Sequence, residues 1–251
     1  MLDNPIFQFE DATRTQLKAS IMIEGLTGKG KSGLALLIAF YLAGGDWKKV
    51  FHIDTENKSA NLFVDIPFSN GKTVGSFKVG QLTEEIGYKP SHYLAFRKAA
   101  IAAGASVVIK DSISHAWMYQ GGVLDLVNIA QANSKNKADK YAAWRDETVA
   151  SEKQKLLSLI RSPDVHVITT VRVKEKFEYV DGDDGKKKLQ SLGEQQIQQG
   201  DLKYEPDLVL HMIRPGHGHT VHPKARVIKS RYAILSEGEE YEFTPELCIQ
   251  L

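Results

Sequence analysis

Residues 25–32 constrain the fold of this chain more than any other stretch. Their sequence, GLTGKGKS, fits the pattern G-x-x-x-x-G-K-[ST]. The short apolar run SIMI precedes them at residues 20–23, and apolar side chains follow at helical spacing: Leu34, Leu37, Ile38 and Leu42. A strand, a glycine-rich loop and a helix in this order form the context in which the pattern binds phosphate.

The loop predicts a nucleotide site. Backbone N–H groups of such a loop point at phosphate oxygens, and the start of the following helix adds a partial positive charge. Lys31 is expected to reach the β- and γ-phosphates, and the Ser32 hydroxyl is expected to bind Mg²⁺. The predicted ligands are therefore ATP and Mg²⁺, held by Gly25, Leu26, Thr27, Gly28, Lys29, Gly30, Lys31, Ser32 and Gly33.

Composition narrows the class of protein. The formal net charge of +1 means that any nucleic-acid surface has to be local. The single cysteine, Cys248, allows no disulfide or cysteine metal site within the chain, which fits a reducing cytoplasm. The longest apolar run, residues 34–43, is too short to span a bilayer. We expect a cytoplasmic protein with no membrane partner.

Strand-like runs alternate with helical patterns along the chain. The runs are residues 20–23, 50–53, 106–109, 165–169 and 208–212. Helices are predicted over 91–104, with Ser91 as the N-cap and Gly104 after the end, and over 141–160. The alternation predicts an α/β fold with a mainly parallel central sheet flanked by helices.

The remaining segments complete the predicted architecture. Three runs near the C-terminus, 209–214, 225–228 and 241–243, are expected to be antiparallel strands. Residues 133–137 and the long stretch 174–203 are predicted loops. We expect a single domain over residues 18–251, preceded by an N-terminal segment over 1–17.

Carboxylates follow the second and third predicted strands. Asp54 and Glu56 come where the second strand leaves the sheet, and a carboxylate there can activate a water for attack on the γ-phosphate. An ordinary acidic turn is the alternative. Asp111 ends the third strand and is predicted to hold Mg²⁺ opposite Ser32.

Polar and basic side chains end two later strands. Thr169, Thr170 and Arg172 fall at the carboxyl end of the fourth strand, where ligands of such sheets bind, so a hydroxyl there could sense the γ-phosphate. Lys229 and Arg231 lie two residues apart, so on a strand they share a face and could reach a phosphate. A plain strand end and a solvated strand face are the alternatives.

Two basic segments are candidate contacts for single-stranded DNA, which needs cations for its backbone and often aromatic faces for its bases. One follows the third strand, and the other lies in the predicted loop from residue 174, where five lysines within 174–188 are balanced by five acids. The candidate contacts are Lys135, Lys137, Lys140, Arg172, Lys174, Lys186, Lys187 and Lys188. A separate group, His211, His217, His219 and His222, is compatible with a metal site or with a hairpin turn.

The order of these motifs resembles the ATPase core of the RecA family over roughly residues 18–245. "FHIDTENKSANLF" resembles the segment that carries the catalytic glutamate, which would be Glu56, and Phe63 falls where the family packs an aromatic ring against adenine. "SVVIKDS" is similar to the family's strand ending in Asp-Ser. Thr170 stands where RecA has glutamine, a departure from the family's γ-phosphate relay. "VIKSR" resembles the stretch whose cations, here Lys229 and Arg231, reach the next subunit's ATP.

The compact core is similar to small RecA-like ATPases of bacteriophages, including single-strand annealing proteins. The resemblance implies a phage or prophage protein in the bacterial cytoplasm that assembles with itself on single-stranded DNA and promotes recombination or annealing. A single-strand-binding protein is a candidate partner, and residues 9–12, FEDA, fit a subunit-docking F-x-x-A pattern. A ring-shaped helicase and a nucleotide-switched protein-binding module without DNA are the alternative functions.

Overall fold

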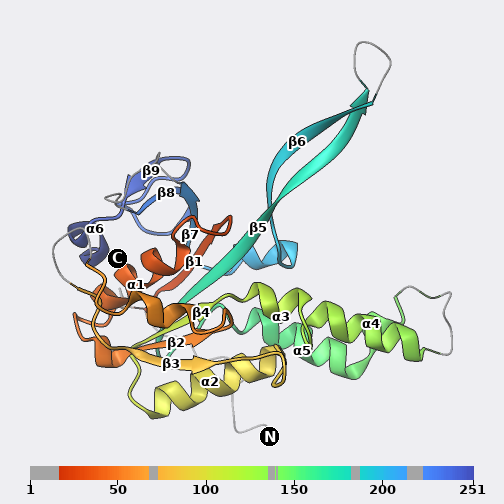
Figure 1. Ribbon diagram of the computed structural model, residues 1–251, viewed down its shortest axis with the longest axis horizontal. Coiled ribbons are helices and arrows are strands. Elements are labelled where there is room, and N and C mark those ends of the chain that lie inside the picture. Colours follow the sequence, from red (N-terminus) through yellow and green to blue (C-terminus); the bar gives the residue numbers. More distant parts are fainter. Residues whose placement is uncertain (1–16, 68–72, 135–138, 140, 182–186, 214–222) are drawn as a thin grey trace, which may run out of the picture.

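The computed structural model describes residues 17–67, 73–134, 139, 141–181, 187–213 and 223–251, with the side chains of 176–193 left aside (Figure 1). Nine strands in this part of the chain form one sheet. In sheet order, eight of them are β3 (Lys78–Gln81), β2 (Val50–Asp54), β4 (Val107–Asp111), β5 (His166–Asp181), β1 (Ser20–Gly25), β7 (Leu208–Ile213), β8 (Lys224–Ser230) and β9 (Glu240–Glu242). The ninth, β6 (Lys187–Gln196), pairs with β5 alone.

The sheet is mostly parallel, as the sequence predicts. The strands from β3 across to β7 all run in one direction, whereas β8 and β9 are antiparallel to their neighbours. Every residue of β1, β2 and β4 is buried, which explains why these strands read as continuous apolar runs rather than as alternating ones. The predicted α/β fold and the antiparallel strands near the C-terminus are both confirmed.

Helices cover both faces of the sheet. On one face, α1 (Lys31–Leu42) packs with α6 (Pro245–Ile249) over a core that includes Ile21 and Ile23. On the other, α2 (Pro90–Ala102), α3 (Ser114–Met118) and α5 (Glu147–Leu157) enclose Met22, with α4 (Val123–Asn133) packed against α3 and α5. Among the described residues, none of the helices has the length and apolar character needed to cross a membrane.

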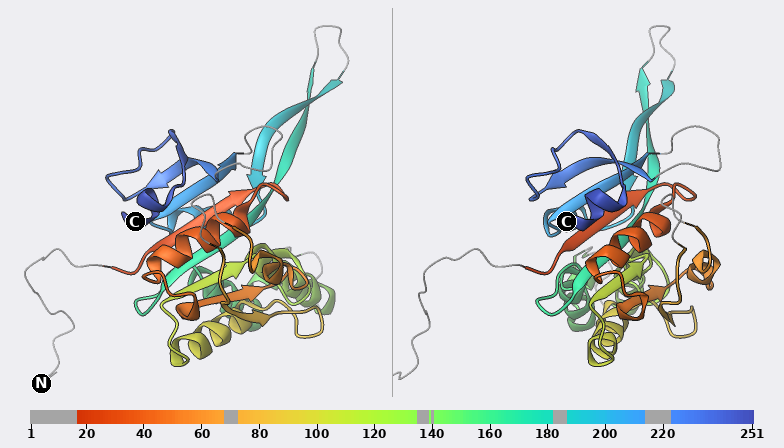
Figure 2. Two further views of the ribbon diagram at one scale, coloured as in Figure 1. Left: turned by 60° about the vertical axis from the view of Figure 1, so that its left-hand side comes forward. Right: turned by 90° about the vertical axis from the view of Figure 1, so that its left-hand side faces the viewer.

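The predicted loop over residues 174–203 is mostly a two-stranded ribbon, so this prediction is wrong. β5 continues for 16 residues, and from Val173 onward it pairs only with β6, in antiparallel register. Figures 1 and 2 show the two strands projecting well beyond the sheet and the helices. The first part of the predicted loop therefore continues β5, a central strand that lies between β4 and β1.

Two helix predictions also need correction. The helix predicted over 91–104 has its N-cap at Lys89 rather than at Ser91, two residues earlier, with Pro90 in the first turn. The pattern over residues 141–160 is divided into a short 3₁₀-helix, η3 (Ala143–Arg145), and α5. Asp146 ends the first and caps the second. The strand β3 and the helices α3, α4 and α6 lie in segments for which the sequence predicts no element.

Candidate functional site

The phosphate-type loop lies between the carboxyl end of β1 and the start of α1. Gly28 and Gly30 adopt left-handed φ angles of +78° and +89°, which strain residues with side chains. A Cβ on Gly25 would lie 3.0 Å from the Cβ of Met212 on β7. The loop backbone can therefore curl tightly beside the sheet because glycine occupies these positions.

Lys31, the first residue of α1, points back into this loop. Its Nζ donates to the carbonyl oxygens of Gly25, at 2.9 Å, and Leu26, at 3.0 Å. Burial lowers the pKa of Lys31, while the negative charge of Asp111 acts in the opposite direction. A buried amine beside the backbone of a glycine-rich loop is a suitable group for binding an anion.

Asp111, at the end of β4, contacts Ser32 directly. Its Oδ2 accepts a short hydrogen bond from the Ser32 hydroxyl, and its Oδ1 accepts one from Thr170. β5 lies between β1 and β4, which places Thr170 next to both loop and carboxylate. The predicted Mg²⁺ pair, Ser32 and Asp111, is therefore brought together, with the hard oxygen ligands that Mg²⁺ prefers. Thr170 is fully buried and bonds to Asp111 instead of lining the cavity.

A buried histidine beside Asp111 is missed by sequence reasoning. His52 on β2 is fully buried, and its Nε2 lies 3.7 Å from Asp111 Oδ2. Neither ring nitrogen has a hydrogen-bond partner in the described part of the chain. Burial lowers the pKa of His52, which favours the neutral ring. Only the folded sheet, in which β2 and β4 are neighbours, reveals this contact.

The two carboxylates after β2 have different roles in the structure. Asp54 closes the turn: its Oδ1 accepts from the backbone N–H of Glu56 at 2.6 Å, and its Oδ2 accepts from that of Ala60 at 3.0 Å. Glu56 instead extends to Arg172 on β5, whose Nε and Nη2 lie 3.0 Å and 2.6 Å from its Oε1. Asp54 therefore shapes the turn, whereas Glu56 is half-buried and paired with Arg172.

A cavity of about 250 Å³ joins these groups. Its lining combines the loop, the turn after β2, the end of β4 and the 3₁₀-helix η2 (Ser59–Phe63): Thr27, Gly28, Gly30, Lys31, Ser32, Glu56, Phe63 and Asp111. A Cβ on Gly33 would lie 3.5 Å from the Phe63 ring, so this ring packs over the start of α1. The cavity lining thus includes an amine, two hydroxyl-bearing residues, two carboxylates and one aromatic ring. Four of the predicted nucleotide contacts, Gly25, Leu26, Lys29 and Gly33, are outside its lining.

Lys229 and Arg231, the cations predicted to reach a neighbouring subunit's ATP, lie near the amino ends of β1 and β7, away from the phosphate loop. Ser230 pairs with Leu208, which pairs with Ile21 near the start of β1, so Lys229 and Arg231 lie far from the loop of their own chain. Lys229 Nζ donates to the carbonyls of Tyr204 and Pro206, both at 2.6 Å, and Arg231 pairs with Asp207 at 3.3 Å. Their action on a neighbouring subunit stays a prediction.

The predicted DNA contacts are less completely placed. Lys174 is exposed where the ribbon begins, and Lys187 and Lys188 lie on β6 opposite Asp181 and Val180, with side chains outside the described part. Other predicted residues lie outside the described residues altogether: Lys135, Lys137, Lys140, Lys186, His217, His219, His222 and the segment 9–12. Arg172 is half-buried, and its charge is already paired with that of Glu56, unlike the free cation expected of a DNA contact.

His211 has acidic partners. Its Nδ1 lies 3.0 Å from Glu24 Oε1, and its Nε2 lies 3.4 Å from Glu194 Oε2 on β6. The hydrogen bond with Glu24 raises the pKa of His211, against the effect of burial. Within the described residues, no group of three or more His, Cys, Asp or Glu side chains could hold a metal ion. His211 on β7 therefore connects this strand to β1 and β6 through its contacts with Glu24 and Glu194.

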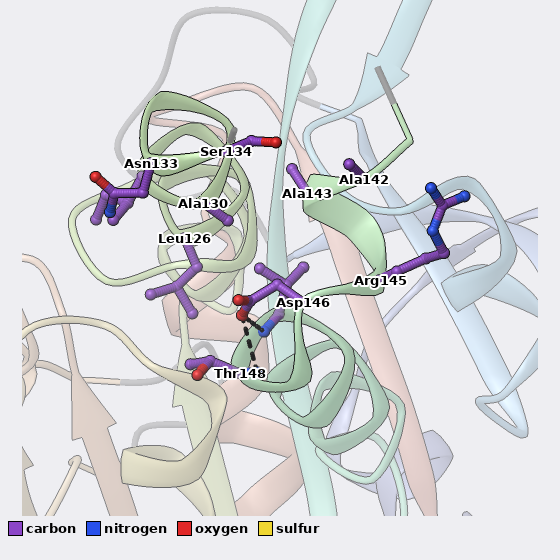
Figure 3. Close-up of a pocket in the computed structure, with 11 residues that line it drawn as sticks. Leu126, Ala130, Asn133, Ser134, Ala142, Ala143, Arg145, Asp146 and Thr148 are labelled. Atoms are coloured by element: carbon purple, nitrogen blue, oxygen red, sulfur yellow. Dashed lines mark hydrogen bonds between the residues drawn. The ribbon is translucent and has the colours of Figure 1, made fainter. Parts of the chain in front are cut away.

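A second cavity, of about 470 Å³, lies between α4, η3 and α5 (Figure 3). Its lining mixes apolar side chains such as Leu126 and Val149 with polar ones such as Asn133 and Arg145, and it contains none of the residues predicted to bind nucleotide. Asp146, on its wall, accepts from the backbone N–H groups of Thr148 at 2.9 Å and Val149 at 3.2 Å. These are the bonds of a helix cap, so the carboxylate is committed to starting α5.

Comparison with known proteins adds no family assignment: neither a scan against protein-family models nor a search of curated proteins finds a match. The chemistry of the site is therefore inferred from its own residues and geometry.

Proposed function

We propose that this protein is a Mg²⁺-dependent ATPase with a RecA-type core. One observation carries the proposal: a single cavity is lined by Lys31, Ser32, Glu56, Phe63 and Asp111. These residues come from four separate segments of the chain, and each has the chemistry that one part of a Mg²⁺–nucleotide complex requires. The parallel sheet supports the proposal as well, since ligands of such sheets bind at the carboxyl ends of the strands.

Each side chain has a defined task in the proposed reaction. The loop amides and Lys31 would bind the phosphates, and Phe63 offers a face for the base. Ser32 and Asp111 would hold Mg²⁺, which supplies charge neutralisation on the transferred phosphoryl group. Glu56 would orient the attacking water and accept its proton. Thr170 would hold Asp111 in place through its hydrogen bond to Oδ1.

We further propose that single-stranded DNA is the partner of this ATPase and that the protein works as an oligomer in recombination or annealing. The ribbon supports DNA binding, because β5 passes beside the proposed nucleotide cavity, continues into the ribbon and carries the exposed Lys174. Lys229 and Arg231 support the second, because they lie too far from their own loop and would complete a site between subunits. A ring helicase would use the same core, and a protein-binding switch would need no DNA.

The test is ATP hydrolysis with and without single-stranded DNA, at low and moderate salt. Glu56→Gln is expected to bind ATP as the wild type does and to lower turnover by about 10²- to 10⁴-fold, the usual contribution of a general base. Glu147→Gln, on the exposed start of α5, is the matched control and should hydrolyse ATP normally. Full turnover in Glu56→Gln would refute the assigned base.

The DNA arm separates the candidate functions. Stimulation by single-stranded DNA, with filaments in electron micrographs, favours recombination or annealing. Closed rings that displace a strand favour the helicase. Turnover that ignores DNA, in a protein that does not bind DNA, would exclude both and favour the protein-binding switch.

A further inference from the structure

Glu56 lines two cavities at once. One is the 250 Å³ cavity at the phosphate loop. The other, of about 770 Å³, lies on the far side of Glu56, between the end of β2, the segment after β3 and α3. Its wall includes Tyr119 and Arg172, together with the carboxylates of Glu84 and Glu85. Arg172 lines this larger cavity and not the one at the phosphate loop, so its ion pair with Glu56 is made from the side away from that loop.

The ion pair restrains the carboxylate that the proposed reaction needs. One oxygen of Glu56 accepts from two nitrogens of Arg172, at 3.0 Å and 2.6 Å. Charge-assisted bonds of this kind are strong, and the pair is largely shielded from water, with the two side chains 29% and 24% exposed. A carboxylate held in this way has fewer lone pairs with which to orient a water. Efficient attack would require Arg172 to release it.

Arg172 is itself fixed at the root of the ribbon. Its Nη1 donates to the Tyr119 hydroxyl at 3.0 Å, and its backbone N–H donates to Ser114 Oγ at 2.9 Å. Its carbonyl accepts from the N–H of Ile197, just after β6, at 2.8 Å. The next residue, Val173, is the first that pairs with β6. Any change in the course of the ribbon therefore moves the backbone that carries this guanidinium.

The β6 side of the root is connected to the phosphate loop in the same way. Gln196, opposite Val173, donates a short hydrogen bond to Glu24, the residue before Gly25. Glu194 reaches His211, which also contacts Glu24. Both strands of the ribbon thus end in side-chain contacts with the candidate site.

We propose that Arg172 is a positioning residue that latches Glu56 in a resting arrangement and releases it when single-stranded DNA engages the ribbon. The proposal rests on the ATPase function proposed above and adds its control. The DNA acts through the ribbon rather than through the larger cavity, because Glu84 and Glu85 on the wall of that cavity repel phosphates. Release would therefore speed the hydrolysis of bound ATP when DNA is present.

The test is the turnover of Arg172→Ala at saturating ATP. Without DNA, its kcat should exceed that of the wild type by about tenfold, which corresponds to an interaction of about 1.4 kcal/mol. Stimulation by DNA should fall towards unity, since no latch remains to be released, and the KM for ATP should stay unchanged. Tyr119→Phe, which removes one support of Arg172 and keeps the ring, should raise the basal kcat in the same direction by less.

Two further variants show where the gain arises. Arg226→Ala removes an arginine from a pair with Glu240 at 2.8 Å, on β8 and β9, and should leave the basal kcat unchanged. The double variant Glu56→Gln/Arg172→Ala should be inactive, because the released group is Glu56. A gain that survives in the double variant would overturn the latch.

Other results distinguish the latch from the ATPase proposal. If the wild type hydrolyses ATP but neither Arg172→Ala nor Tyr119→Phe raises the basal kcat, with both folded by circular dichroism and able to bind ATP, the latch is wrong and the ATPase stands. If the wild type neither binds nor hydrolyses ATP, the proposed function fails and the latch fails with it.

Discussion

Replacing Thr170 by valine tests how Asp111 is held before any ligand binds. Valine has nearly the same shape as threonine, so the change removes a hydroxyl without opening a large space. Thr170 is 0% exposed and Asp111 is 3% exposed, so water does not readily replace the lost donor. His52 Nε2, at 3.7 Å from the other carboxylate oxygen, is too far away to take over.

The expected cost follows from this environment. Hydrogen bonds to charged groups contribute about 1.5–3 kcal/mol, and we expect Thr170→Val to lower the free energy of unfolding by about 2 kcal/mol. With a urea m-value of about 3 kcal/mol/M, the unfolding midpoint would fall by about 0.7 M. Urea titration followed by circular dichroism, without nucleotide or Mg²⁺, measures the shift.

The neighbouring threonine provides a matched control. Thr169 is also 0% exposed, but its hydroxyl only reaches the Ile21 carbonyl at 3.4 Å, a long and weak contact. Thr169→Val should therefore shift the midpoint much less. Equal shifts for the two variants, or a loss below about 0.5 kcal/mol for Thr170→Val, would contradict the view that Thr170 supports Asp111, the proposed Mg²⁺ ligand.

Three further predictions concern stability. The raised pKa of His211 means that its contact with Glu24 is fully present below about pH 6.5 and is lost as the pH rises through the folded-state pKa, so His211→Gln should be more destabilising at pH 5.5 than at pH 9 in urea titrations. Burial holds the pKa of Lys110 well below its usual range, so the unfolded chain binds more protons and stability should rise with pH up to about 10.4; Lys110→Met should remove this rise in thermal melts between pH 7 and 10. Asp146→Ala removes the cap of α5 and should cost about 1 kcal/mol, with Asp146→Asn nearly neutral; an equal loss in both would argue against capping.

The local part of the site was predictable because its signals are contiguous in sequence. The loop before α1 carries its glycines, lysine and serine within eight residues, and Asp111 directly ends an apolar strand. The pair between Glu56 and Arg172 joins residues 116 positions apart, and His52 meets Asp111 only across neighbouring strands. No short sequence pattern encodes contacts of this kind.

The ribbon was missed for a different physical reason. Apolar alternation identifies strands that bury one face, but much of β6, with the sequence KKLQSLGEQQ, is polar. The interruption before α5 was also missed, although Asp146 followed by Glu147 and Thr148 is typical of a helix start. A continuous helical periodicity on both sides of Asp146 hid that signal.

β5 also has a consequence for how the molecule opens. Its first residues have hydrogen-bonded strands on both sides, β4 and β1, whereas those from Val173 onward have only β6. Isolated two-stranded ribbons are marginally stable in water, while central strands exchange their amide protons only when the whole domain unfolds. One continuous strand should thus show two classes of hydrogen exchange, with the boundary near Val173. Shortening the ribbon from its tip would therefore remove residues without disrupting the part of the sheet that unfolds cooperatively.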